Sequence, residues 1–330
     1  MQNGGLVTKY KELWVEIFGD NLAFVDKYFS KFLNDDTFCH ITDTETTDQS
    51  NQELISALIA CKYKWFWQEE LFDFAYLSGI LTDKNHRKQG YCSQLITNSL
   101  NKLSKNDTLL CGLIAADENL IEYYKKFGFV QINPTKEVIF NRRNINKSLI
   151  DSYFLLKDID LTDHRYIRFF SRRDNAVSHS IETLALYDNN YLKYAVMYQG
   201  SLRSVAIGRK TKDFIELIDI NYTDSQALEA ILSLIAFTYK KDVKILKHQN
   251  GMLRILNAHK LLEIYASKHY NEDFSLHITD EIITQNNITV RICNSTVQNI
   301  KNSYAIPHLT IEELTLKLFS DGKMFLMLDI

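Results

Sequence analysis

The sequence predicts an α/β fold of the α+β type, with a mixed, mostly antiparallel sheet in its first part. Three observations predict it. Two helical patterns open the chain, and three strand-like segments follow them before residue 82. A strand, a basic turn, a helix, a strand and a helix then succeed one another within residues 74–129. A similar order of strands and helix recurs near residues 191–246. This grouping is typical of layered α/β domains.

Length, charge and residue usage limit the class of protein. The chain has 330 residues, which indicates two or three domains of about 100 to 200 residues each. Its formal net charge of -3 gives no reason to expect a nucleic acid partner. The five cysteines include no CxxC pair and the nine histidines no HxxxH or HExxH spacing. We therefore expect neither a disulfide framework nor a bound metal.

Two further sequence patterns indicate where in the cell the protein is located. No apolar run reaches the roughly 18 residues that a membrane span needs. The first residues lack the basic segment followed by an apolar one that is typical of a signal peptide. These observations lead us to expect no membrane span and a cytoplasmic location.

The first elements follow from apolar periodicity. Residues 9–33 predict two short helices, because apolar side chains recur there at helical spacing. Asp20 follows a glycine and is the expected N-cap of the second helix. Strands are expected next, at residues 38–42, 54–67 and 71–81. After the basic turn we expect a helix from residue 92, a strand at 108–115 and a helix that ends near residue 129.

The remaining elements form two more groups. Basic residues and Pro134 mark a boundary near residues 133–147. The second group has helical patterns near 164–187, strands near 191–198, 201–207 and 214–220, a helix at 225–239 and a strand at 243–246. The third starts near residue 251 and has a helix at 259–266, alternating strands near 274–278 and 288–292, a helix at 311–319 and an apolar tail at 324–330.

The turn between residues 82 and 92 carries the chemistry of an anion site. A helix N-terminus offers unpaired N–H donors and the positive end of the helix dipole. Gly90 allows close approach of a ligand to the backbone, and Arg87 and Lys88 add positive charge. The strand before the turn can pair with an extended ligand along its edge, and Gly79 within it indicates a bulge or a close approach. The equivalent turn of the second group, residues 221–225, contains neither Gly nor Arg, so we expect a structural pseudo-repeat that does not bind phosphates.

Acyl transfer from a thioester also needs a proton donor and a base. Tyr124 lies on the buried face of its helix and is either a core tyrosine or the donor, whereas Tyr123 is expected at the surface. The sequence leaves the base open. Glu69, Glu70, Asp73 and the C-terminal carboxylate of Ile330 are candidates.

Residues 80–92, ILTDKNHRKQGYC, and residues 124–129, YKKFGF, resemble the GNAT superfamily of acyl-coenzyme A N-acyltransferases. The order of segments is similar to the Enhanced intracellular survival (Eis)-like branch of that superfamily. The resemblance implies a catalytic GNAT domain at residues 1–145 and a degenerate GNAT-like domain at 146–248. It implies a sterol-carrier-protein-like α/β domain at 249–330.

The resemblance also implies roles for individual residues. Tyr124 is expected as the general acid, and the terminal carboxylate of Ile330 as the general base. The residues expected to contact coenzyme A are Ile80, Thr82, Arg87, Lys88, Gly90, Tyr91, Cys92 and Asn119. Cys92 stands where the family usually has Gly or Ala.

The function that follows is an acetyl-CoA-dependent N-acetyltransferase without a metal. It transfers an acetyl group to a primary amine of a small molecule, or of a lysine or peptide, by direct attack in a ternary complex. Two alternatives stay open. One is a non-catalytic protein with an apolar ligand in the last domain, and the other is an aminoacyl or long-chain acyl transferase on the same fold. Whether the chain forms a homo-oligomer also stays open.

Overall fold

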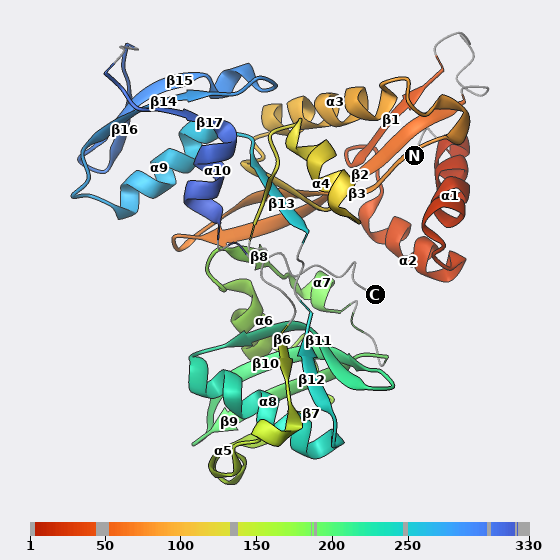
Figure 1. The fold of residues 1–330 in the computed structure, drawn as a ribbon, viewed down its shortest axis with the longest axis vertical. Helices are drawn as coiled ribbons and strands as arrows, with labels where there is room; N and C mark the ends of the chain where they lie inside the picture. Colours follow the sequence, from red (N-terminus) through yellow and green to blue (C-terminus); the bar gives the residue numbers. More distant parts are fainter. Residues whose placement is uncertain are drawn as a thin grey trace. The chain divides into compact units, whose positions relative to one another are not determined.

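The computed structural model describes residues 4–43, 53–132, 138–185, 187, 190–246, 250–301, 305–320 and 322. They form two compact units. Unit 1 contains Met1–Lys64, Phe72–Gln131 and Met252–Ser320, and unit 2 contains Trp65–Leu71 and Ile132–Gly251. Figure 1 shows the elements of each unit.

The first sheet of unit 1 has the strand order β1-β2-β3-β4-β13-β5. Strands β1 and β2 are antiparallel, β3 and β4 are parallel, and β13 is antiparallel to β5. The sheet is therefore mixed. Its strands are β1 (Phe38–Thr42), β2 (Leu54–Trp67), β3 (Glu70–Thr82), β4 (Leu110–Ile114), β13 (Gly251–Ile255) and β5 (Val130–Gln131).

Helices cover both faces of this sheet (Figure 1). They are α1 (Gly4–Phe18), α2 (Leu22–Phe32), α3 (Tyr91–Lys105) and α4 (Glu118–Lys125). Successive residues of a strand point to opposite faces. On β2, Ala60 packs in one core cluster with Leu95 and Ile96 of α3. The next residue, Cys61, lies with its Sγ 3.1 Å from the Tyr28 hydroxyl of α2. Helix α3 therefore covers one face and α2 the other.

A smaller sheet completes unit 1, in the order β16-β15-β14-β17. Helix α10 begins with a capping box, in which Thr310 and Glu313 each accept a backbone N–H of the other. The elements of this part are α9 (Ala258–Lys268), β14 (Phe274–Thr279), β15 (Ile288–Cys293), β16 (Thr296–Asn299), β17 (His308–Thr310) and α10 (Ile311–Phe319).

A buried ion pair joins this part to the first sheet. The guanidinium of Arg254, on β13, donates to both carboxylate oxygens of Asp280, at 2.7 and 2.9 Å. It also donates to the carbonyl of Phe127, just beyond α4. Asp280 in turn accepts the backbone N–H groups of Ile282 and Ile283. One arginine therefore connects β13, the end of α4 and the loop after β14.

Unit 2 contains a sheet in the order β6-β12-β11-β10-β9-β7. In it β11 and β12 are parallel and are joined by helix α8, as β3 and β4 are joined by α3 in unit 1. Its helices are α5 (Lys147–Ser152), α6 (His164–Ser171), α7 (Ile181–Leu184) and α8 (Ser225–Tyr239). The strands of that sheet are β6 (Val138–Phe140), β7 (Phe154–Lys157), β9 (Leu192–Tyr198), β10 (Ser201–Lys210), β11 (Phe214–Tyr222) and β12 (Asp242–Ile245). The short strand β8 (Ala176–Ser178) is not part of it.

The mixed α/β fold predicted from the sequence is confirmed, and two details differ. The N-cap of α2 is Asn21, whose side chain accepts the N–H of Phe24, while Asp20 accepts the indole N–H of Trp14 at 2.7 Å. The helical pattern near residues 164–187 is interrupted, because β8 lies between α6 and α7. The division into three domains stays a prediction. Of the described residues, no helix is both long and apolar enough to cross a membrane.

Candidate active site

Strands β3 and β4 pair over only part of their length. Their register runs from Phe74 opposite Leu110 to Tyr76 opposite Gly112, while β3 continues to Thr82. Among the described residues, the β3 backbone beyond Tyr76 therefore has no register partner on β4. An extended ligand with amide groups can bind such a strand edge in place of a further strand.

Gly79 lies in this stretch of β3 and has a left-handed φ of 59°. A side-chain carbon at this position would lie 1.9 Å from the indole of Trp14 and 2.5 Å from the hydroxyl of Tyr10. The same hydroxyl donates to the Gly79 carbonyl at 2.8 Å. The close approach expected at this glycine is confirmed, and its cause is the packing of α1 on the strand.

The turn after β3 is held by buried polar groups. The Ser56 hydroxyl donates to the carbonyl of Leu81 at 2.7 Å and lies 3.0 Å from the Thr82 hydroxyl. Asp83 is buried, and its carboxylate accepts the N–H of Asn85 at 2.9 Å. Its own N–H donates to the carbonyl of Ile55 at 2.9 Å. The path from the strand to the helix is thus fixed before any ligand binds.

Helix α3 begins without a side-chain cap. Its N-cap residue is Gly90, with a φ of 90°, and no side chain accepts its first N–H groups. A side-chain carbon added at Gly90 would have no neighbour within 4 Å, so the space beside the turn is open. Arg87 and Lys88 are exposed close by. These features fit the pyrophosphate of a coenzyme, which such N–H donors and positive charges bind.

Helix α8 of unit 2 begins differently. Its N-cap is Asp224, whose carboxylate accepts the N–H of Ala227 at 2.8 Å and forms an ion pair with Arg203. The negative charge of Asp224 occupies the position that an anionic ligand would need. The structure thus supports the prediction that this turn does not bind phosphates.

Two tyrosines of α4 face the start of α3. Tyr124 is buried, and its burial raises the pKa of its hydroxyl well above the ordinary value, with smaller contributions from Cys92 and Tyr123. Tyr123 was expected at the surface, and this prediction is wrong. Its hydroxyl lies 3.0 Å from that of Ser93, and burial raises its pKa to about 12. The sequence pattern marks only one face of α4, and therefore missed Tyr123.

Cys92, in the first turn of α3, lies among these groups. Burial raises the pKa of its thiol, and the neighbouring Tyr123 and Thr82 hydroxyls partly offset this rise. Thr82 ends β3, so a contact network links the strand edge, the start of α3 and α4. The expected site residues Thr82, Cys92 and Tyr124 therefore come together.

The other expected residues have these positions. Ile80 is half-buried on β3 and packs against the α3 core, and Tyr91 is half-buried at the start of α3. Asn119 is exposed in the first turn of α4. Ile330, expected as the general base, lies outside the described residues.

The carboxylates weighed as alternative bases lie at the other end of β3. Asp73 precedes Thr82 by nine residues of strand, which corresponds to roughly 30 Å. It forms an ion pair with Lys64 at 2.6 Å. Glu69 and Glu70 precede it in the chain. Asp73 is therefore too far along the strand to act as a base beside Thr82.

Comparisons with known proteins agree with this arrangement. Residues 4–132 match the family model of the acetyltransferase (GNAT) domain. This part contains β3, the turn and both helices of the candidate site. No curated protein matches the chain at a significant level.

Solved structures show the same fold over most of the chain. A GCN5-related N-acetyltransferase from Anabaena variabilis has a TM-score of 0.73 at 14% identity, and the match covers 98% of this chain and 95% of the other. One from Kribbella flavida has a TM-score of 0.70 at 13% identity, with 94% and 85% covered. Eis1 from Mycobacterium abscessus has a TM-score of 0.62 at 12% identity, with 86% and 80% covered. The chain therefore shares the fold of these three structures over most of its length.

The described residues contain no group of His, Cys, Asp or Glu side chains that could hold a metal ion. The polar groups that meet near the turn before α3 are instead hydroxyls, a thiol and backbone N–H donors. This set can bind an anion and donate a proton.

Proposed function

We propose that the chain is an acetyl-CoA-dependent N-acetyltransferase that acetylates a primary amine of a small molecule, lysine or peptide. One observation carries the proposal. A turn, residues 83–90, joins the uncapped N-terminus of α3 to a strand that parts from its neighbour. In this proposal residues 87–92 bind the pyrophosphate, and the β3 backbone at Ile80 and Thr82 binds the pantetheine arm.

The chemistry is a direct transfer. The amine nitrogen attacks the thioester carbonyl, the C–N bond forms, and the C–S bond breaks. The raised pKa of Tyr124 keeps its hydroxyl protonated at neutral pH, the state in which it can donate a proton to the leaving sulfur. The terminal carboxylate of Ile330 takes the proton of the amine in this proposal.

The proposal includes three domains with the boundaries expected from the sequence. The shared order of β3–α3–β4 and β11–α8–β12 supports a degenerate GNAT-like second domain. The sterol-carrier-like assignment of residues 249–330 rests on the resemblance of the sequence.

The test of Tyr124 is a comparison of two conservative variants. With acetyl-CoA and a panel of primary amines, release of free thiol is expected from the wild-type protein. Tyr124→Phe should lower kcat by about 100-fold or more, with acetyl-CoA affinity unchanged. Tyr123→Phe removes a hydroxyl from the neighbouring position and should keep kcat within a few-fold.

Two results would contradict the proposal. Absence of thiol release with every amine argues against the activity itself. Equal turnover of wild type and Tyr124→Phe, with a large loss in Tyr123→Phe, would assign proton donation to Tyr123 instead.

A further inference from the structure

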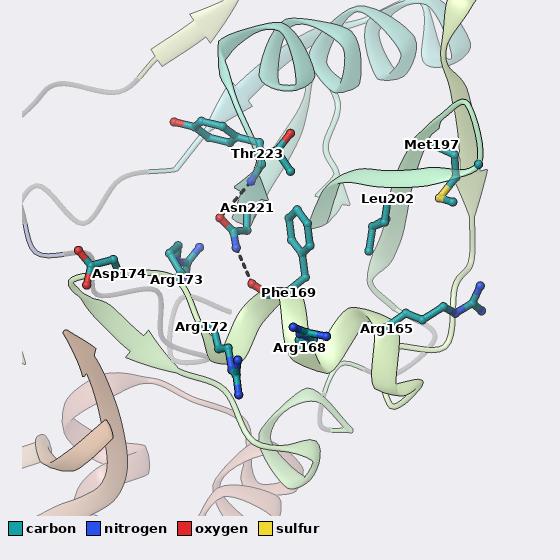
Figure 2. A pocket seen from close by; sticks show the side chains of 12 residues that line it. Arg165, Arg168, Phe169, Arg172, Arg173, Asp174, Met197, Leu202, Asn221 and Thr223 are labelled. Atoms are coloured by element: carbon teal, nitrogen blue, oxygen red, sulfur yellow. Dashed lines mark hydrogen bonds between the residues drawn. The ribbon is translucent and has the colours of Figure 1, made fainter. Parts of the chain in front are cut away.

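Unit 2 contains a pocket of about 680 Å³ that the proposed activity does not use. It lies between α6 and residues of β9, β10 and β11 (Figure 2). Its volume is within the range of about 300 to 1,000 Å³ that is usual for small-molecule sites. We call it the arginine pocket, after Arg165, Arg168, Arg172 and Arg173 in its lining.

Positive charge is concentrated here. Four of the eleven arginines of the chain fall between residues 165 and 173. Arg165 is neutralised by Asp163, at 2.9 Å, and Arg173 by Asp219, at 2.6 Å. The exposed Arg168 and Arg172 form no ion pair with any described residue. Among the described residues, these two positive charges of the pocket therefore have no counterion.

Arg168 and Arg172 also lie close together in the chain, at the C-terminal end of α6. Arg168 is in the last turn of α6, and Arg172 is the C-cap residue that follows its last helical residue, Ser171. The C-terminal end of a helix favours cations, but two like charges that lie close together repel each other. A doubly charged anion removes this repulsion, and guanidinium groups bind phosphate oxygens in pairs.

The other side of the pocket is apolar and held in place. Figure 2 shows Phe169 pointing from α6 toward the strands that carry Met197 and Leu202. The Asn221 side chain fixes this wall, because its amide donates to the Phe169 carbonyl and its oxygen accepts the N–H of Tyr222 at 3.0 Å. An apolar group of a ligand can therefore lie next to the arginines.

We propose that the arginine pocket binds a small organic phosphate. Its phosphate pairs with Arg168 and Arg172, and its apolar part contacts Phe169, Met197 and Leu202. The one carboxylate in the lining, Asp174, accepts the N–H of Gln68 at 2.9 Å. The inference does not depend on acetyl transfer, since every residue it uses belongs to unit 2.

Phenyl phosphate is a suitable probe, because it combines a dianion with an apolar ring. Binding to the full-length protein is measured by calorimetry, with inorganic phosphate and benzoate as comparisons. Phenyl phosphate should bind more tightly than either. The double variant Arg168→Gln/Arg172→Gln should weaken its binding at least about tenfold. The control Arg143→Gln/Lys147→Gln removes two exposed charges of unit 2 outside the pocket and should leave affinity unchanged.

Hydrogen exchange locates the probe independently of affinity. Phenyl phosphate should slow exchange in peptides that cover residues 164–173. Three results would overturn the inference: no binding of phenyl phosphate, equal affinity in the wild type and Arg168→Gln/Arg172→Gln, or slowing confined to residues 82–93 of unit 1. Benzoate that binds as tightly as phenyl phosphate would reject phosphate as the recognised group.

Discussion

Gly90 and Asp224 stand at the same point of two similar strand–helix–strand segments. The glycine leaves the N–H donors of α3 free of any side-chain cap, whereas the aspartate uses a donor of α8 and adds a negative charge. A single residue type thus separates a turn that fits an anion from one that excludes it. This contrast is visible in the sequence, because Asp and Gly at a helix start have opposite consequences for a ligand.

Cys92 provides a reporter at the same place. It is half-buried, while the other four cysteines are buried. A cysteine-specific alkylating reagent at pH 7.5 should therefore modify Cys92 first, as detected by peptide mass spectrometry. Because its pKa is raised, the rate should rise about tenfold per pH unit below that pKa.

Saturating acetyl-CoA should slow this modification, since the proposed coenzyme site includes Cys92. The buried Cys111 serves as an internal control and should stay unmodified in the folded protein. If acetyl-CoA leaves the rate of Cys92 alkylation unchanged, the coenzyme binds at another site.

At the scale of elements, the packing of α1 on β3 depends on the absence of a side chain at Gly79. Gly79→Ala should lower the free energy of unfolding by at least about 2 kcal/mol, because it combines a left-handed φ with a clash against Trp14. Gly19→Ala is the matched control. Its φ is 75°, but an added carbon would have no neighbour within 4 Å, so only about 1 kcal/mol is expected.

Chemical denaturation measures both values. Equal losses in the two variants would show that backbone conformation alone, without the packing of α1, accounts for the cost at Gly79.

Periodicity predicted most elements of the fold. Strand β2 and helix α8 have the predicted bounds, because each is a segment rich in apolar residues with polar residues on both sides in the sequence. Strand β13 was expected only as the start of a third segment, yet it pairs beside β4. Pairing between strands that lie far apart in the sequence produces no local sequence pattern from which it could be predicted. The position of Tyr123 depends on contact with Ser93 of another helix, which the helical pattern of α4 alone does not contain.

At the scale of the molecule, the buried Arg254–Asp280 pair connects two parts of unit 1. Both side chains are 1% exposed, whereas the similar pair Arg291–Asp273 is 50% and 56% exposed. Asp280→Asn leaves a buried guanidinium uncompensated and should cost about 3 to 5 kcal/mol of unfolding free energy. The control Asp273→Asn should cost less than about 1 kcal/mol.

Denaturant titration of the two variants gives both free energies. Similar costs would mean that the buried pair does not connect β13 to the loop after β14 in the way described.

The central claim is that the start of α3 binds acetyl-CoA, and calorimetric titration tests it most directly. The wild-type protein should bind acetyl-CoA. Gly90→Leu, which places a side chain in the open space at the turn, should weaken binding at least tenfold. Gly19→Leu introduces a side chain at another left-handed, open glycine and should bind like the wild type. No binding by the wild type, or equal affinity in Gly90→Leu, would contradict the account.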